Sequence, residues 1–136
     1  MVEFALVLPL LLIVLFLVVD FGVGFTRWIA ITNATREGAR YGAVGHSAGE
    51  ISDKVVYTSN DILTAADVSV GYLYDGPDAA IGDSVVVRAV YDYSLITPLG
   101  KFLSGLTFDS IEFKACADMR LEQVPDPAPL APGPCD

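Results

Sequence analysis

Hydrophobic residues form one unbroken run near the N-terminus and periodic groups after it. The apolar run, residues 4–19, holds no charge and lies between Glu3 and Asp20. With residues 21–25 added, it reaches the roughly twenty residues that a helix needs to cross a bilayer. Helical periodicity continues to about residue 42–45, so the pattern predicts one long helix that begins in lipid and ends in water.

The periodicity of the remaining chain predicts a second helix followed by strands. Residues 50–66 repeat apolar side chains at helical spacing, whereas residues 68–74, 83–95 and 110–122 follow strand-like patterns. The alternation is cleanest in the last run, and one set of its side chains is expected to face the long helix. That set is Ile111, Phe113, Ala115, Ala117, Met119 and Leu121.

These elements predict an α+β fold in four parts. Residues 1–25 form a transmembrane or filament-core stem, and residues 26–45 continue its helix into the head. The head, residues 46–124, adds a short second helix and a three-stranded antiparallel sheet packed on the lower part of the long helix. Residues 125–136 form a C-terminal tail with five of the eight prolines of the chain.

Composition and charge narrow the classes of function. The formal net charge of -9 lies beyond residue 40, which argues against nucleic acid as a partner. His46 is the only histidine, so multi-histidine metal sites are excluded and any histidine-containing triad would have to use His46, which lies among turn residues. Asp75, Asp78 and Asp83 lack the spacing of a calcium-binding loop and are better explained as a solvated turn. We therefore expect no enzyme, cofactor or metal site.

The cysteines indicate the compartment of the head. Cys116 and Cys135 are the only two, and their pairing is favoured over free thiols in an oxidising compartment. Since Cys116 is expected on the outward face of the last strand, the bridge would fold the tail back over the sheet. Closing a loop of this length is worth about 3 kcal/mol.

Charges around the stem bear on its orientation. A cleaved secretory signal peptide is rejected, because the residue before the apolar run is the acidic Glu3 and no small-x-small cleavage site follows by Phe25. Arg27, Arg36 and Arg40 would keep the head in the cytoplasm by the positive-inside rule, whereas a disulfide places it outside. Both observations are met if a basic leader preceded Met1 and was removed.

Two acidic residues at the ends of the apolar run are candidates for assembly. Glu3 either lies among the headgroups or pairs with the N-terminal amine of a neighbouring chain. Asp20 and Arg27 are too far apart along one helix for an ordinary ion pair, so Asp20 is expected to meet an arginine of a neighbouring chain or to be a plain interface residue.

Small side chains recur at every fourth position in the lower half of the long helix. Such a ridge either lies beneath the sheet of the head, as we expect from residue 34 onward, or allows close contact with another helix. Its first part, near the stem, is the better candidate for contact between chains. The ridge comprises Gly22, Thr26, Ala30, Ala34, Gly38 and Gly42.

Three motifs of the N-terminal region carry a resemblance to a known family. They are VEFALVLP at residues 2–9, DFG at residues 20–22 and NATREGARYGA at residues 33–43. In this order they resemble the TadE-like pseudopilins of tight-adherence pili. The resemblance implies cleavage by a prepilin peptidase, extraction from the inner membrane by pilus assembly machinery, and packing of stems into a filament or its initiating complex.

Two functions are consistent with these observations. In the first, the chain is a pilin-like subunit that assembles with copies of itself or other pilins into an extracellular pilus or pseudopilus for adhesion or secretion. It would lie in the inner membrane before assembly, with its head outside the cytoplasm. In the second, it is a monomeric membrane-anchored envelope domain that binds another protein through its sheet or tail.

Overall fold

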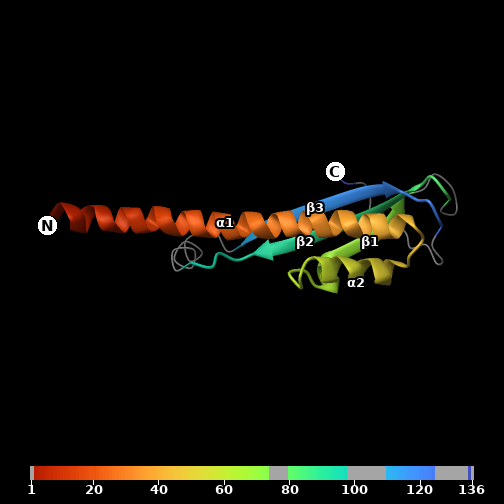
Figure 1. Ribbon diagram of the computed structural model, residues 1–136, viewed down its shortest axis with the longest axis horizontal. Coiled ribbons are helices and arrows are strands. Elements are labelled where there is room, and N and C mark those ends of the chain that lie inside the picture. The colour runs from red at the N-terminus through yellow and green to blue at the C-terminus, as the bar shows by residue number, and fades with distance from the viewer. Residues whose placement is uncertain (1, 74–79, 98–109, 125–134, 136) are drawn as a thin grey trace. The chain divides into compact units, whose positions relative to one another are not determined.

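The computed structural model describes residues 2–73, 80–97, 110–124 and 135 and shows an α+β fold (Figure 1). The predicted order of elements is confirmed: a long helix, a short helix, then a three-stranded antiparallel sheet. The elements are α1 (Val2–Ala43), α2 (Ala48–Thr58), the 3₁₀ turn η1 (Ala65–Asp67), β1 (Val68–Leu73), β2 (Ser84–Tyr93) and β3 (Ile111–Arg120).

Helix α2 is shorter than the sequence predicted. It ends at Thr58, well before residue 66, because Asn60 and Asp61 adopt φ angles of 55° and 57°. These left-handed conformations cannot continue a right-handed helix. Leu63, which had been assigned to the helix, is nevertheless buried in the core. The apolar spacing therefore marked a buried segment but not its conformation.

The chain divides into two units, formed by residues 1–27 with 92–113 and by residues 28–91 with 114–136. The core of the second unit combines α1, α2 and the sheet. Its completely buried members include Ile31 of α1, Ile51 and Val55 of α2, and Val85 and Val87 of β2.

Two glycines of α1 allow α2 to approach closely. A Cβ atom at Gly38 would overlap with Val55 Cγ2, and one at Gly42 would lie 2.8 Å from Ile51 Cδ1 and 3.0 Å from Val85 Cγ2. Any larger residue at either position would therefore push into the core. The lower part of the small ridge is buried, as expected, and it faces α2 as well as the sheet.

The sheet has the strand order β1-β2-β3. β1 and β2 are antiparallel in a register that runs from Val68 opposite Ala89 to Leu73 opposite Ser84. In β3, Ala115 and Ala117 are buried while Cys116 and Asp118 are exposed, so the predicted alternation is confirmed there. Ile111 is an exception, because it is exposed at the start of the strand.

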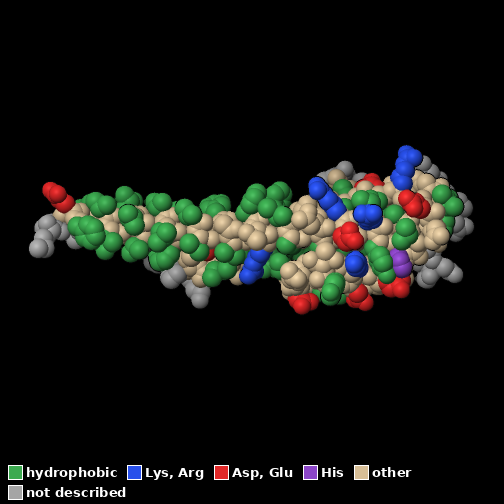
Figure 2. Space-filling view, in the orientation of Figure 1, with side chains coloured by type: hydrophobic (Ala, Val, Ile, Leu, Met, Phe, Trp, Pro, Cys, Tyr) green, Lys and Arg blue, Asp and Glu red, His purple; other side chains and the backbone are tan. Residues whose placement is uncertain are grey.

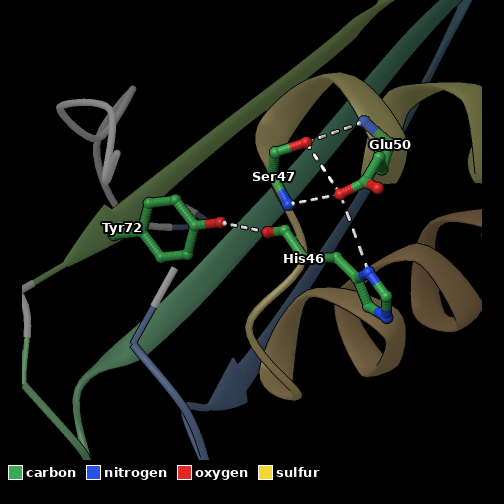
Figure 3. Close-up of polar contacts among 4 residues, drawn as sticks. All are labelled: His46, Ser47, Glu50 and Tyr72. Atoms are coloured by element: carbon green, nitrogen blue, oxygen red, sulfur yellow. Dashed lines mark hydrogen bonds and ion pairs between the residues drawn. The ribbon is translucent and has the colours of Figure 1, made fainter. Parts of the chain in front are cut away.

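The corner between α1 and α2 is held by a capping box (Figure 3). The Ser47 hydroxyl accepts a bond from the Glu50 N–H, and the Glu50 carboxylate accepts bonds from the Ser47 N–H and hydroxyl at 2.9 and 2.8 Å. These bonds from Ser47, followed by attraction to His46, lower the pKa of Glu50 from its ordinary value.

His46 and Tyr72 complete this corner. The His46 ring stacks on Tyr41 with a centroid distance of 3.6 Å, and its Nδ1 lies 3.7 Å from the Glu50 carboxylate. The Tyr72 hydroxyl donates a hydrogen bond to the His46 carbonyl (Figure 3). Burial raises the pKa of Tyr72. His46 therefore has a structural place here, and Ser47 is the residue that caps the helix.

The predicted disulfide between Cys116 and Cys135 is present, with Cα atoms 5.7 Å apart. It ties the chain end to the exposed face of β3, as the alternation of that strand predicted. The rest of the proline-rich tail, residues 125–134, lies outside the described residues, as do Asp75 and Asp78 of the acidic turn. Asp83 of that turn accepts a hydrogen bond from the Ala80 N–H at 2.6 Å.

Candidate assembly surface

The N-terminal part of α1 exposes an apolar surface. Every described side chain from residue 3 to residue 19 is exposed except Phe16, which is half-buried. Figure 2 shows these hydrophobic side chains along the helix in the face turned to the viewer. Contiguous apolar surface of this extent is typical of a site that lipid or another protein covers. By length and composition, α1 is able to cross a membrane.

Glu3 lies exposed at the beginning of this apolar surface. Since its side chain is on the surface of α1, it is accessible to a lipid headgroup or to another chain. Both interpretations of Glu3 from the sequence stay open, and its role in assembly stays a prediction.

Asp20, at the other end of the apolar run, is buried with an exposed fraction of 3 %. One carboxylate oxygen accepts bonds from the backbone N–H groups of Ile96 and Thr97, each at 3.1 Å. The other accepts a bond from the Thr97 hydroxyl. The Asp20 carboxylate, for which an arginine of a neighbouring chain was one of two expected environments, is thus bound within its own chain. Hydrogen bonds to a carboxylate are among the stronger ones in proteins.

Tyr93 joins Asp20 and Arg27 on this side of α1. Its hydroxyl donates a bond to the Asp20 carbonyl at 3.2 Å, and the Arg27 guanidinium lies 5.5 Å from the centre of its ring. Phe113 stacks on the same ring at a centroid distance of 5.7 Å. A Cβ atom at Gly24 would lie 3.3 Å from the Tyr93 ring, so this glycine leaves room for the tyrosine.

The sequence did not reveal the partners of Asp20. A charge beside an apolar helical run signals that some partner must exist. Nothing local identified Thr97, which is 77 residues away. The structure therefore identifies three residues of this region that the sequence analysis missed: Gly24, Tyr93 and Thr97.

The upper part of the small ridge differs from its lower part. Gly22 is exposed, and a Cβ atom there would meet nothing within 4 Å. Thr26 is also exposed, and its hydroxyl donates a bond to the Gly22 carbonyl at 2.9 Å. Ala30 is half-buried, whereas Ala34, Gly38 and Gly42 are buried. Gly22 and Thr26 thus remain accessible to another helix, and their role in assembly stays a prediction.

The chemistry of a metal centre is not assembled in the part of the chain that the structure describes. No three side chains of His, Cys, Asp or Glu come together there in a group that could hold an ion.

Comparison with known families bears on the N-terminal region. Residues 1–40 match the family model described as TadE-like protein. Comparison with curated proteins and with solved structures found no match. The matched segment contains the apolar run, Glu3, Asp20 and the upper part of the small ridge. The resemblance noted in the sequence is therefore confirmed for this segment, and the first 40 residues of the chain are TadE-like.

Proposed function

We propose that this protein is a pilin-like structural subunit that assembles through α1 into an extracellular pilus or pseudopilus, which serves adhesion or secretion. The observation that carries the proposal is the exposed apolar run, residues 4–19, within the segment that is TadE-like. Its acidic head is displayed outside the cytoplasm, where the disulfide is stable.

Assembly exchanges lipid for neighbouring helices around the stem. Lipid chains are as apolar as leucine, so burial of apolar surface gives little net driving force for this exchange. Close packing and polar pairing must therefore supply it. Gly22, Thr26 and Ala30 offer a path for close packing, and the exposed Glu3 offers a carboxylate for the N-terminal amine of the next chain.

The partners in this scheme are copies of the chain or other pilins. Before assembly the protein lies in the inner membrane, where a prepilin peptidase removes a leader and the assembly machinery extracts the stem. Asp20 is left out of the proposed contacts between chains, because its carboxylate is bound by Ile96 and Thr97. Arg27, which lies against Tyr93, contributes to the fold of the same region.

Glu3→Ala tests the proposal, with Glu37→Ala as a matched control, because Glu37 is also an exposed glutamate of α1. Surface fibres are sheared from cells and their protein is identified by mass spectrometry, while the membrane fraction is assayed for the subunit. We expect wild type and Glu37→Ala in fibres, and Glu3→Ala in the membrane only. Glu3→Gln should behave like Glu3→Ala, since the amide cannot neutralise an amine.

Two outcomes would contradict the proposal at different levels. Normal fibres from Glu3→Ala would remove the role of Glu3 and leave packing of the stem as the basis of assembly. Absence of the wild-type protein from any fibre, with all of it in the membrane, would favour the monomeric envelope domain instead.

A further inference from the structure

The position of Asp20 along α1 sets its depth in a membrane. Asp20 follows Glu3 by seventeen residues, which corresponds to about 26 Å of helix. The hydrocarbon core of a bilayer is about 30 Å thick. With Glu3 at one surface and α1 crossing the membrane, Asp20 therefore lies at, or a few ångströms inside, the opposite edge of the hydrocarbon.

The hydrogen bonds of Asp20 bring a second segment to the same depth. The backbone nitrogens of Ile96 and Thr97 each lie 3.1 Å from one carboxylate oxygen of Asp20. These two residues therefore lie at nearly the same depth in the membrane as Asp20. A carboxylate at the edge of the hydrocarbon is unfavourable without partners. Breaking the hydrogen bonds to Asp20 therefore costs more free energy in the membrane than it would in water, so we expect these bonds to be kept there.

Apolar side chains are exposed around α1 at this level. The side chain of Ile96, the residue whose N–H binds Asp20, is 52 % exposed. Phe21 and Phe25 are 72 % and 61 % exposed, and they lie about 100° and 140° around the helix from Asp20. A docked protein would cover one side of the helix, whereas lipid surrounds it. Exposure both beside Asp20 and about 100–140° around the helix from it, continuous with the apolar run, fits lipid.

We infer that residues 94–97 form a second membrane contact of this protein, with the Ile96 side chain in the acyl chains next to the headgroups. Asp20 ties this contact to α1, so the end of β2 reaches the membrane surface together with the helix. The inference rests only on the membrane-anchored stage of the proposed function and does not require assembly into a fibre.

Quenching of tryptophan fluorescence by brominated lipid measures this depth in the full-length protein. The sole tryptophan, Trp28, is replaced by phenylalanine, and single tryptophans are introduced by Ile96→Trp, Ile81→Trp and Leu11→Trp. Ile81 is the matched control, because it is an isoleucine of the head with 74 % exposure. Leu11 lies in the apolar run and reports insertion of α1.

The variants are reconstituted in vesicles of phosphatidylcholine and phosphatidylglycerol, with bromine at carbons 6 and 7 of the acyl chains. We expect the tryptophan at position 96 to be quenched several-fold more than that at position 81 and to emit at shorter wavelength. The tryptophan at position 11 should be quenched as well.

Each alternative result has a definite meaning. Quenching at position 11 with none at position 96 overturns the inference and leaves the anchored helix intact. No quenching at position 11 overturns membrane insertion, and with it the proposed function. A blue-shifted, unquenched signal at position 96 that disappears on dilution with lipid assigns the surface to a second copy and also overturns the inference.

A second measurement uses the wild-type chain and is independent of variant folding. A phosphatidylcholine with a diazirine in its upper acyl chain is photolysed in the reconstituted vesicles, and labelled peptides are identified by mass spectrometry. Labelling of the peptide that contains Ile96, without labelling of the peptide that contains Ile81, supports the inference. Equal labelling of both peptides, or labelling of neither, overturns it.

Discussion

Helix α1 shows two opposite relations between side-chain type and burial. In residues 4–19 large apolar side chains are exposed, whereas in residues 31–43 the buried positions are mostly alanine, glycine and threonine. Under the proposed function, the large side chains meet lipid or other chains and not the core of their own chain. Among the small ones, Gly38 and Gly42 lie where α2 approaches the helix, and Gly42 also lies against Val85 of the sheet. Hydropathy of a helix therefore does not indicate which part of it belongs to the core of its own fold.

Substitutions at Ile51 and Ile13 should show the largest difference in the free energy of unfolding between the two parts of α1 and its surroundings. Ile51 of α2 is completely buried, whereas Ile13 of the apolar run is exposed. Ile51→Ala should lower the free energy of unfolding of the head by about 2–5 kcal/mol, because it removes core contacts and leaves a cavity. Ile13→Ala should change it by less than about 0.5 kcal/mol.

Urea denaturation in detergent micelles, followed by near-ultraviolet circular dichroism, measures both values. An equal loss for the two variants would mean that residues 4–19 contribute to the core of the head, contrary to their exposure.

The disulfide gives the next largest effect and is confined to the second unit. Cys116→Ser with Cys135→Ser, or reduction of the wild type, should lower the free energy of unfolding by about 3 kcal/mol, because the unfolded chain gains freedom. Non-reducing peptide mapping of protein from cells should show the two cysteine peptides joined. Two alkylatable thiols in that protein would show that the bridge does not form in its native compartment.

Gly38 and Gly22 compare buried and exposed positions of the small ridge. Gly38→Ala should destabilise the head by about 1–3 kcal/mol through overlap with Val55, partly offset by the higher helix propensity of alanine. Gly22→Ala meets no neighbour within 4 Å and should not destabilise it.

Thermal unfolding in micelles compares the two glycine variants, and fibre assembly is assayed in parallel. Loss of fibres from Gly22→Ala with unchanged thermal stability would place Gly22 in a contact between chains. Destabilisation by Gly22→Ala would contradict its exposed position.

The smallest expected effect is the contribution of the capping box of α2 to the stability of the fold at acidic pH. Hydrogen bonds from Ser47 lower the pKa of Glu50 below its ordinary value of 4.5 in the folded state. As the pH falls, Glu50 is therefore protonated in the unfolded chain at a higher pH than in the folded protein. The resulting stabilisation is complete above 4.5 and is lost as the pH falls through the lowered folded value.

Thermal unfolding from pH 7 down to about pH 3 measures this contribution. Glu50→Gln should remove it from the pH profile. Ser47→Ala should remove only part of it, because the backbone N–H of residue 47 still donates to the carboxylate. An unchanged pH profile for Glu50→Gln would show that the capping box has no share in acid stability.

Several features of the fold were predictable because they depend on local pattern. The alternation of β3 identified Ala115 and Ala117 as buried and Cys116 as exposed, which also made its bridge to Cys135 sterically reasonable. The end of α2 was predicted wrongly, since the apolar spacing at Ile62 and Leu63 continues past the left-handed residues Asn60 and Asp61. Asparagine and aspartate adopt that conformation more readily than most residues, but their types alone did not require it.

The candidate surface was predictable at its ends but not in its contacts. Glu3 and Asp20 stand out because a charge beside an apolar run is unusual. Their different environments, one exposed and one buried, could not be derived from that pattern. Hydrogen bonds from Ile96 and Thr97 make the difference.

The sequence by itself determined the long apolar helix and the TadE-like character of residues 1–40, because contiguous hydropathy and short motifs are properties of neighbouring residues. Only the tertiary structure decided that Asp20 binds its own chain and that Gly38 lies against Val55. The first contact depends on where β2 ends and the second on how α2 packs on α1. Contacts between segments distant in sequence are set by the packing of whole elements, which no local pattern records.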